Sequence, residues 1–550
     1  MRTRFMLLIG LTTALGAVGG CQSDGAGRDG GARLYDGMGN HSRVISTDSA
    51  EAQRYFDQGL QLTFGFNHDE AIRSFRRAAA LDPGAAMPWW GVAYCNGINI
   101  NDPQMGEQRS RDAWDATRRA MANIERASPT ERALIGALSA RYAWPPPEDR
   151  SGLDRAYADA MREVHERYPD DGDVAALYAE SLMNLQPWDY WTHDGEPKGR
   201  ILEVVSVIER GLERSPEHPG LNHFYIHAVE ASADPDRAVP AADRLVSLVP
   251  GSGHLVHMPS HIYIRVGRYG DAAGSNVDAV AIDRAYFEQA PEPGLYAAYY
   301  AHNLHFLAFA TMMSGDEETA LRAARDLEAD MPEAPLRDFA GLIEGVMPTN
   351  FHVLIRFGRW EEVLREPDYP EWRAMSRAVR SYARSIACSA LGRTEQARAE
   401  MAEFERRAAL VPEEWYVMQN RVTDVLPIAR AMIEGELLYR EGRREEAFAK
   451  LRAGIAAEDK LVYDEPPGWM LPVRHALGAL MMADGRYAEC EAVYREDLAR
   501  NRENMWSLTG LRLALEAQGK TDEAAAVGAR LETALADATV RPSSSCLCEP

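Results

Sequence analysis

Apolar and small residues recur along this chain with the long period of a helical hairpin. Between Ala52 and Ala85, positions 4, 8, 20, 24, 27 and 32 of a 34-residue unit are Tyr55, Gly59, Ala71, Phe75, Ala78 and Pro83. Small residues at such positions let two helices come into contact. The pattern therefore predicts a pair of packed helices over this segment, and not a strand.

The same marks return at intervals as far as the C-terminal part of the chain. They are Gly267, Tyr269, Ala272 and Ala279; Gly315, Ala320 and Pro332; Gly358 and Trp360; Gly392 and Ala397; Gly435, Gly442 and Ala447; Gly478, Gly485 and Tyr487; Gly519 and Ala524. A glycine at position 15 of a unit is expected to end the first helix in a left-handed turn, and a proline near position 32 to close the second. These marks resemble the tetratricopeptide repeat (TPR) family, with about eleven units between residue 50 and about residue 536. The resemblance implies an all-α, TPR-like α-solenoid, a right-handed superhelix of stacked hairpins with a concave groove.

Three stretches depart from the period. Residues 97–150 begin with the turn Asn99-Ile-Asn-Asp-Pro103, continue with two amphipathic helices and end at Trp144-Pro-Pro-Pro147. Residues 186–200 and 464–469 are rich in proline and tryptophan, and we expect ordered loops there, with their aromatic residues as packing anchors.

The composition excludes some classes of function. A net charge of -23, from 83 acidic and 60 basic residues, argues against nucleic acid as a partner, because phosphate binding needs a basic surface. Six cysteines in 550 residues are too few for a disulfide framework. A chain that is 46% hydrophobic can nevertheless bury a large core.

The N-terminal sequence is typical of an export signal. Arg2 and Arg4 precede an apolar run from Phe5 to Val18 that is too short to span a bilayer. Val18-Gly-Gly-Cys21 resembles the lipobox of bacterial lipoproteins, which implies lipid attachment at Cys21, with ordinary secretion and a retained anchor as alternatives. Gln22 after the cysteine implies, by the same resemblance, the periplasmic side of the outer membrane or the cell surface. Residues 22–49 are predicted to form a flexible tether.

Histidines are concentrated in one part of the chain. Seven of the 14 lie between residues 223 and 305. Counted from the glycine, alanine and proline marks, they fall at positions 2, 5 and 9 of their units, which in the TPR family line the concave groove. The seven are His223, His227, His254, His257, His261, His302 and His305.

Such spacing suits metal coordination, because residues three or four apart stand on one face of a helix. The seven imidazoles, with Glu180 as a carboxylate ligand, could therefore bind a divalent transition metal (Zn, Cu, Fe or Mn); otherwise no cofactor is expected. Asn222, Tyr225, Tyr263 and Asn303 are candidates for orienting the rings through hydrogen bonds. The alternatives are histidines that only pack in helix contacts, and a groove that binds peptide carboxylates without metal.

Catalysis has weaker support in the sequence. A metal with an open position could activate water, with Glu180 or Glu230 as the base. The sequence contains no HExxH pair, nucleophile elbow or P-loop, so no reaction can be named. Cys546-Leu-Cys548 could bind a soft metal, but we expect it to lie in a mobile tail.

The sequence thus predicts a signal at 1–21, a tether at 22–49, N-terminal repeats at 50–250 with the insertion at 97–150, histidine-rich repeats at 251–340, C-terminal repeats at 341–536 and a disordered tail at 537–550. The first hypothesis for function is a lipid-anchored scaffold that binds envelope proteins or peptides in its groove. The alternative is a metal-binding protein, or a metal-dependent hydrolase or oxidoreductase, that uses the histidines. Whether the protein is an enzyme stays open at this stage.

Overall fold

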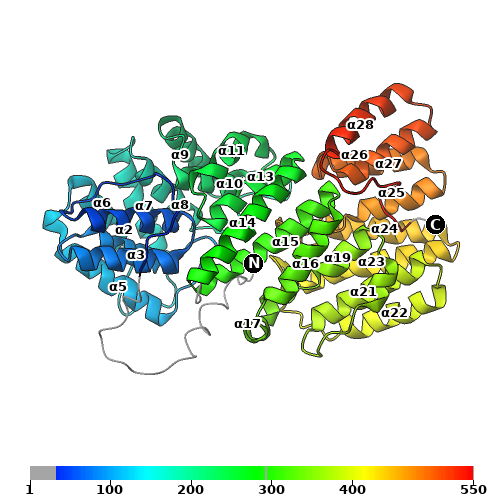
Figure 1. Ribbon diagram of the computed structural model, residues 1–550, viewed down its shortest axis with the longest axis horizontal. Helices are drawn as coiled ribbons and strands as arrows, with labels where there is room; N and C mark the ends of the chain where they lie inside the picture. Colours follow the sequence, from blue (N-terminus) through cyan, green and yellow to red (C-terminus); the bar gives the residue numbers. More distant parts are fainter. Residues whose placement is uncertain (1–31, 291–293, 549–550) are drawn as a thin grey trace. The chain divides into compact units, whose positions relative to one another are not determined.

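The computed structural model describes residues 32–290 and 294–548, and the fold is all-α (Figure 1). Over these residues the only strands are the two-residue β1 (Tyr416–Val417) and β2 (Asn420–Arg421), which form a small antiparallel hairpin. The predicted TPR-like α-solenoid is confirmed. The predicted signal and the lipid-attachment residue Cys21 lie outside the described residues. None of the helices described has the length and apolar character needed to cross a bilayer.

The chain divides into two compact units. The first comprises Met1–Ile262 and Val277–Tyr300, and the second Tyr263–Asn276 and Ala301–Pro550. Three helices contribute residues to both units: α13 (Pro259–Val266), α14 (Tyr269–Gln289) and α15 (Ala297–Ser314).

The first unit holds the N-terminal hairpins and the irregular insertion. Its helices are α2 (Ala50–Phe64), α3 (His68–Leu81), α4 (Met87–Cys95), α5 (Glu107–Ala122), η1 (Ile124–Arg126), α6 (Pro129–Ser139), α7 (Ser151–Arg167), α8 (Gly172–Met183), α9 (Ile201–Arg214), α10 (Pro219–Val229), η2 (Pro235–Ala238), α11 (Val239–Leu248), α12 (Gly253–His257) and η3 (Gly294–Tyr296).

The second unit holds the C-terminal hairpins. Its helices are α16 (Glu317–Asp330), α17 (Glu333–Asp338), α18 (Ala340–Ile343), α19 (Thr349–Arg356), α20 (Trp360–Arg365), α21 (Ala374–Ala390), α22 (Thr394–Ala408), α23 (Val422–Arg440), α24 (Arg444–Glu458), α25 (Val473–Ala483), α26 (Tyr487–Arg500), α27 (Met505–Ala517) and α28 (Thr521–Ala534).

Small residues let the two helices of each hairpin approach closely. In the pair α2 and α3, a Cβ on Gly59 would lie 2.6 Å from the ring of Phe75, so no larger residue fits there. Ala71 and Ala78 on the facing helix are fully buried. The predicted contact positions of the repeat are therefore occupied as expected.

The turns between paired helices also follow the prediction. Glycines at position 15 of their units have positive φ angles, the left-handed conformation that a residue without Cβ adopts at no steric cost. They are Gly267, Gly315, Gly358, Gly392, Gly442, Gly485 and Gly519. The first repeat differs, because Phe66 stands at this position with φ 55°.

The described part of the predicted tether is packed against the first unit. Arg43 donates to Asp171 and Asp173 at 2.9 to 3.0 Å, and His41 Nε2 lies 2.8 Å from Asp173 Oδ1. Ile45 is 4% exposed. The expectation of a flexible segment is therefore wrong for residues 32–49, because ion pairs and an apolar anchor hold them.

The irregular stretches are ordered, as expected. Asn99 and Asp102 pair across the predicted turn, and α5 and α6 are the two helices expected after it. In the 186–200 loop, the indole of Trp188 donates to the carbonyl of Ile100 at 2.9 Å and that of Trp191 to the carbonyl of Ala228 at 2.8 Å. The tryptophans of this loop therefore act as packing anchors.

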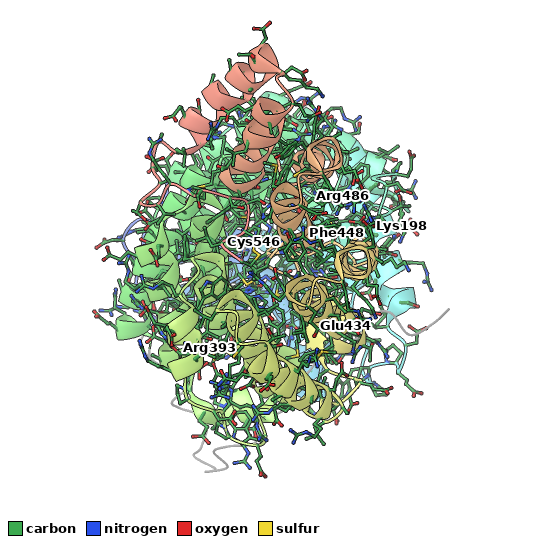
Figure 2. All side chains as sticks on the ribbon, turned by 90° about the vertical axis from the view of Figure 1, so that its right-hand side faces the viewer. Lys198, Arg393, Glu434, Phe448, Arg486 and Cys546 are labelled. Carbon is green, nitrogen blue, oxygen red and sulfur yellow. A yellow bond between two sulfur atoms is a disulfide. The ribbon has the colours of Figure 1, made fainter. Side chains whose placement is uncertain are left out.

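The C-terminal segment is packed against the second unit, so the prediction of a disordered tail is wrong for residues 537–548. Ser545 is fully buried; its hydroxyl lies 2.7 Å from that of Tyr494 and donates to the carbonyl of His475 at 2.8 Å. Cys546 and Cys548 form a disulfide (Figure 2), so their thiols do not act here as a soft-metal site.

One buried carboxyl group makes the stability of the second unit depend on pH. Glu436, on α23, is 1% exposed, and neither of its oxygens has a hydrogen-bond partner among the described residues. Burial raises the pKa of Glu436 from 4.5 to about 7, although Arg440 opposes the shift. The Glu436 carboxyl therefore binds a proton more tightly in the folded protein than in the unfolded chain. Its contribution to the unfolding free energy is fully present below about pH 4.5 and is lost as the pH rises through 7.

In the wild type, ionisation of Glu436 should lower the unfolding free energy by about 3 kcal/mol between pH 5 and pH 9, at about 1.4 kcal/mol per pKa unit. We predict that Glu436→Gln abolishes this part of the pH dependence. Chemical denaturation at the two pH values measures the effect. Glu434→Gln on the same helix is the matched control, because Glu434 is partly exposed and pairs with Lys450 at 2.8 Å. Equal pH dependence in the Glu436 variant and the wild type would contradict the prediction.

Candidate metal centre

Two of the predicted histidines stand on α10, a helix in the core of the first unit. Pro219 begins the helix, and His218 caps it by accepting the backbone N–H of Leu221 on Nδ1 at 3.1 Å. Every residue of α10 is buried, and the helix packs on α2, α8, α9 and α11. His223 and His227 are one turn apart, so both rings lie on the same face.

The third histidine, His254, is held by its backbone on α12. Its N–H donates to the hydroxyl of Tyr296 at 3.0 Å, and that hydroxyl donates to Asp283 Oδ1 at 3.1 Å. A Cβ on the preceding Gly253 would lie 2.0 Å from Asp283 Oδ1, so glycine is required for the carboxylate to come this close. The two hydrogen bonds that link Asp283, Tyr296 and the His254 N–H therefore fix the backbone position from which this imidazole extends.

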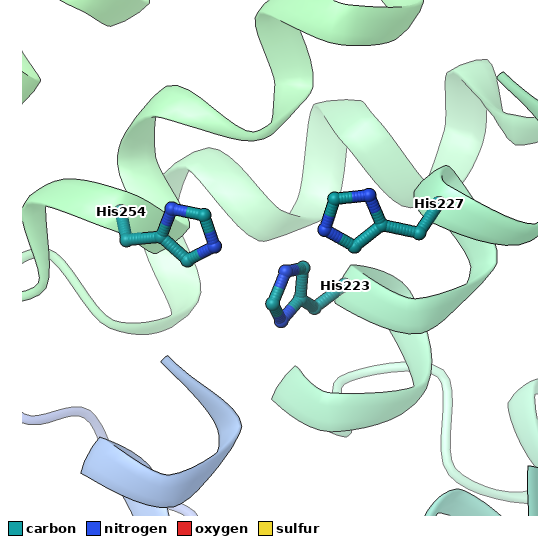
Figure 3. A group of neighbouring side chains, drawn as sticks. All are labelled: His223, His227 and His254. Atoms are coloured by element: carbon teal, nitrogen blue, oxygen red, sulfur yellow. The ribbon is translucent and has the colours of Figure 1, made fainter. Parts of the chain in front are cut away.

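The three imidazoles converge, as Figure 3 shows. The ring centroids of His223 and His227 are 4.8 Å apart, and those of His223 and His254 are 5.0 Å apart. One nitrogen of each ring lies within 4.8 Å of the other two. Residues on two separate helices thus present three nitrogen ligands to one point.

Hydrogen bonds set the orientation of two of these rings. His223 Nδ1 lies 2.6 Å from the carbonyl oxygen of Phe64, and His227 Nδ1 lies 3.2 Å from Glu230 Oε1. An oxygen acceptor at Nδ1 places the proton there and leaves a lone pair on Nε2. Neither Nε2 atom has a hydrogen-bond partner in the described part of the chain. This is the arrangement by which proteins fix the tautomer of a metal-binding histidine.

His254 has no hydrogen-bond partner on either ring nitrogen among the described residues, although it is only 2% exposed. Buried polar groups are seldom left unpaired, because an unmet donor or acceptor costs about 1 to 3 kcal/mol. Four nitrogen atoms of three neighbouring rings are in this state: His223 Nε2, His227 Nε2 and both nitrogens of His254.

Glu230 connects this group to two more histidines of the first unit. Its Oε2 accepts from His261 Nδ1 at 2.7 Å, while its Oε1 faces His227. His261 Nε2 then lies 2.9 Å from His257 Nε2, so that pair shares a hydrogen bond. The structure therefore brings together five of the seven predicted histidines, around a carboxylate other than the one we predicted as a ligand.

Burial keeps the three converging imidazoles neutral. It lowers the pKa of His223 and His254 well below the usual value of 6.5, with neighbouring imidazoles adding to the effect, and it also lowers the pKa of His227. Burial alone would raise the pKa of Glu230, but His261 and His227 hold it below its usual value of 4.5. The centre thus combines neutral nitrogen ligands with one nearby negative charge.

Aromatic side chains that the histidine pattern does not reveal pack around the centre. Phe66 stacks on His254 at 5.6 Å and on His227 at 6.2 Å, and meets His223 edge-on at 4.7 Å. Tyr299 lies 4.4 Å from His254. A signal for Phe66 was present in the sequence, because it takes the position at which later repeats have glycine.

Three of the predicted residues of the first unit lie in other networks. Glu180 accepts from the hydroxyl of Tyr94 at 2.8 Å and from Asn184, so it is not brought to the imidazoles as a ligand. Asn222 donates to two backbone carbonyls, and Tyr225 donates to Glu209. Helix phase alone could not distinguish these positions from ligand positions.

Four further predicted residues belong to the second unit: Tyr263, His302, Asn303 and His305. Within that unit, Tyr263 packs under the guanidinium of Arg268 at 4.2 Å, and Asn303 is fully buried on α15. Their convergence with the five histidines of the first unit stays a prediction.

A second histidine group in the first unit has the contacts of an ion-pair network. Asp173 Oδ1 lies 2.8 Å from His41 Nε2 and 3.1 Å from His218 Nε2, while its Oδ2 accepts from Arg43 at 2.9 Å. Both carboxylate oxygens are thus engaged, and a guanidinium already neutralises the charge. This group therefore differs from the His223 centre, where ligand atoms are unpaired.

Comparisons with known proteins found only distant structural similarity. No family model and no curated protein matches the sequence. Three similar solved structures are the human IFIT1 dimer with m7Gppp-AAAA, yeast Tom70 and the APC/C hetero-tetramer Cut9-Hcn1. All three are helical repeat proteins of the TPR type.

Their similarity to this chain is low. IFIT1 is 11% identical, with 82% of this chain and 90% of that chain covered and a TM-score of 0.32. Tom70 is 11% identical, with 86% and 90% covered and a TM-score of 0.29. Cut9-Hcn1 is 12% identical, with 91% and 79% covered and a TM-score of 0.31. No argument about this chain rests on similarity this low.

We predict that Tyr296→Phe lowers the unfolding free energy of the protein by about 1 to 3 kcal/mol, because it leaves His254 N–H and Asp283 without the hydroxyl between them. Urea denaturation followed by circular dichroism measures the change. Tyr157→Phe is the matched control, since the buried hydroxyl of Tyr157 has no hydrogen-bond partner in the described residues. The two variants should differ; equal stability would show that the Tyr296 hydroxyl does not hold His254.

Proposed function

We propose that the first unit binds a divalent transition-metal ion, zinc or copper(II), through Nε2 of His223, Nε2 of His227 and one nitrogen of His254. Two observations carry the proposal: one nitrogen of each ring lies within 4.8 Å of the other two, and the named nitrogens are buried with no hydrogen-bond partner among the described residues. A bound ion would satisfy one nitrogen of each ring at once.

The geometry requires only a small adjustment. Zinc binds histidine nitrogen at about 2.0 to 2.1 Å, so tetrahedral ligands stand about 3.4 Å apart. The three nitrogens lie within 4.8 Å of one another, so small rotations of the side chains bring them to that spacing.

The ligand chemistry favours zinc or copper(II) over other ions. Imidazole nitrogen suits these two ions, whereas manganese and magnesium prefer oxygen ligands. The carboxylate of Glu230 supplies a counter-charge one ring away, through Nδ1 of His227. It would act as the carboxylate behind the ligand, which raises the basicity of the imidazole and holds its tautomer.

We assign metal binding to this centre and no reaction. A three-histidine site leaves a fourth position, as catalytic zinc sites do. However, the ring of Phe66 packs against all three imidazoles, so we propose no substrate site beside them. The TPR-like fold would serve as the scaffold that positions the ligands.

Metal analysis of purified protein tests the proposal. We expect one zinc or copper ion per chain by mass spectrometry, retained through gel filtration, and its loss in His254→Ala. Glu230→Gln should weaken binding by about 10- to 100-fold, because the hydrogen bond behind a ligand contributes that much. His193→Ala, at an exposed position, is the control and should bind as the wild type does.

Two results would contradict the proposal. One is a chain that holds no zinc or copper at micromolar free metal, although circular dichroism shows it to be folded. The other is equal metal content in the wild type and in His223→Ala, His227→Ala and His254→Ala.

We further propose, from the N-terminal sequence, that the chain is exported and lipid-anchored at Cys21, with envelope proteins or peptides as partners. The support is the charged start, the short apolar run and Val18-Gly-Gly-Cys21. A TPR-like fold is consistent with a protein-binding scaffold.

Metabolic labelling with palmitate tests the anchor. We expect the wild-type chain to incorporate label and to fractionate with membranes, and Cys21→Ser to do neither, because that substitution removes the acylated sulfur. Cys95→Ser, a buried cysteine of α4, is the control for the loss of a thiol. Unlabelled wild-type protein would contradict the anchor.

A further inference from the structure

A small cavity lies inside the second unit, formed by residues far apart in sequence. Its volume is about 10 Å³, which is room for one ion or one water molecule. The side chains with metal-binding or aromatic character in its wall are His305, His352, Met375, Trp469 and Met470.

The two imidazoles of the wall have unpaired nitrogens. Nδ1 of His305 and Nδ1 of His352 lack a hydrogen-bond partner within the described ranges, although the residues are 3% and 7% exposed. Burial lowers the pKa of His305 to about 3, with His352 adding to the effect, and lowers that of His352 to about 4. Both rings are therefore neutral and able to act as ligands at physiological pH.

The other candidate ligands are two thioethers. Met375 is 2% exposed and Met470 is 4% exposed, so both sulfurs lie in the core. The hydroxyl of Thr349 lies 3.8 Å from Met470 Sδ. Its single proton forms the shorter hydrogen bond, to the carbonyl oxygen of Val346 at 2.6 Å. The sulfur of Met470 thus keeps its lone pairs.

The loop that carries Trp469 and Met470 is fixed in place. Asp464 accepts the backbone N–H of Gln419 at 3.1 Å and the side-chain amide of Asn420, on β2. Trp469 meets His352 edge-on, with ring centroids 5.0 Å apart. The irregular stretch found in the sequence at 464–469 therefore holds one wall of the cavity.

The charge of the wall decides which ion fits. None of the described residues that line the cavity is an aspartate or glutamate, and the charge of Arg356 adds to the burial that lowers the pKa of His352. A divalent ion would keep two uncompensated charges in a dry site, which is costly. A monovalent ion with soft preferences matches neutral nitrogen and thioether ligands, and copper(I) is the biological ion of that kind.

We propose that this cavity binds one copper(I) ion through the imidazoles of His305 and His352 and the thioether sulfurs of Met375 and Met470. The indole of Trp469, which meets His352 edge-on, would form part of the wall around the ion. This site is separate from the centre of the first unit and differs from it in ligand type and in the charge of the ion.

Anaerobic copper(I) titration of the full chain tests the proposal. The chain is first loaded with zinc to occupy the first unit, or carries His223→Ala, His227→Ala and His254→Ala, and is titrated against bathocuproine disulfonate with ascorbate present. We expect one copper(I) per chain, with sulfur scatterers in the first coordination shell by X-ray absorption. Met375→Leu with Met470→Leu should weaken binding more than 10-fold.

The matched control is Met432→Leu, a buried methionine of the same unit that does not line the cavity and whose sulfur accepts from Tyr382 at 3.5 Å. It should leave copper(I) affinity unchanged. Circular dichroism confirms that each variant is folded, and His305→Gln gives an independent variant.

Three outcomes overturn the proposal: no copper(I) retained, copper(I) without sulfur ligands, or equal loss of affinity in Met432→Leu. A crystal structure of the copper-treated protein with an ordered water in the cavity, and no copper, would show the first of these outcomes directly. Failure of the first-unit centre shows separately, as zinc content that does not depend on His254.

Discussion

Close contact between the two helices of each hairpin is the constraint on which the structure depends. A helix of this chain buries its apolar stripe only when its partner can approach, and the approach is possible because glycine or alanine stands at the contact. Gly59 against Phe75 and Gly435 against Leu451 repeat this arrangement in the two units. Without it the first helices could not lie beside one another, and their inward faces would not be close enough to share a ligand.

The candidate centres follow from that packing. In the first unit, α10 and α12 bring imidazoles together, and the end of α2 supplies the carbonyl of Phe64 that orients one of them. In the second unit, α15, α19 and α21 meet a loop that adds Trp469 and Met470. In each centre, most of the candidate ligands lie on the first helix of a hairpin. Residues that depart from the repeat pattern, such as Phe66 and the loop with Trp469, pack around them.

The sequence was sufficient for the fold because its signals are local. Turn glycines such as Gly442 and contact residues such as Gly59 are set by the hairpin itself, so the period reveals them. It was also sufficient to select His223, His227 and His254, since helix phase puts them on an inward face. It failed where position depends on the third dimension: Glu180 has the right phase but bonds to Tyr94, and Glu230 takes the carboxylate role from beyond the end of α10. Residues 32–49 and the C-terminal segment appear as tails in composition, whereas the ion pairs of Arg43 and the buried Ser545 are contacts that no local pattern encodes.

The left-handed backbone at Phe66 has a consequence for dynamics. A non-glycine residue in this region costs of order 1 kcal/mol, and the conformation persists because the ring is held against the three imidazoles. Loss of that ring packing would favour relaxation of the turn between α2 and α3. The order of the three imidazoles and the opening of the first hairpin are therefore thermodynamically linked: an interaction that orders the rings also slows amide exchange in the turn between α2 and α3.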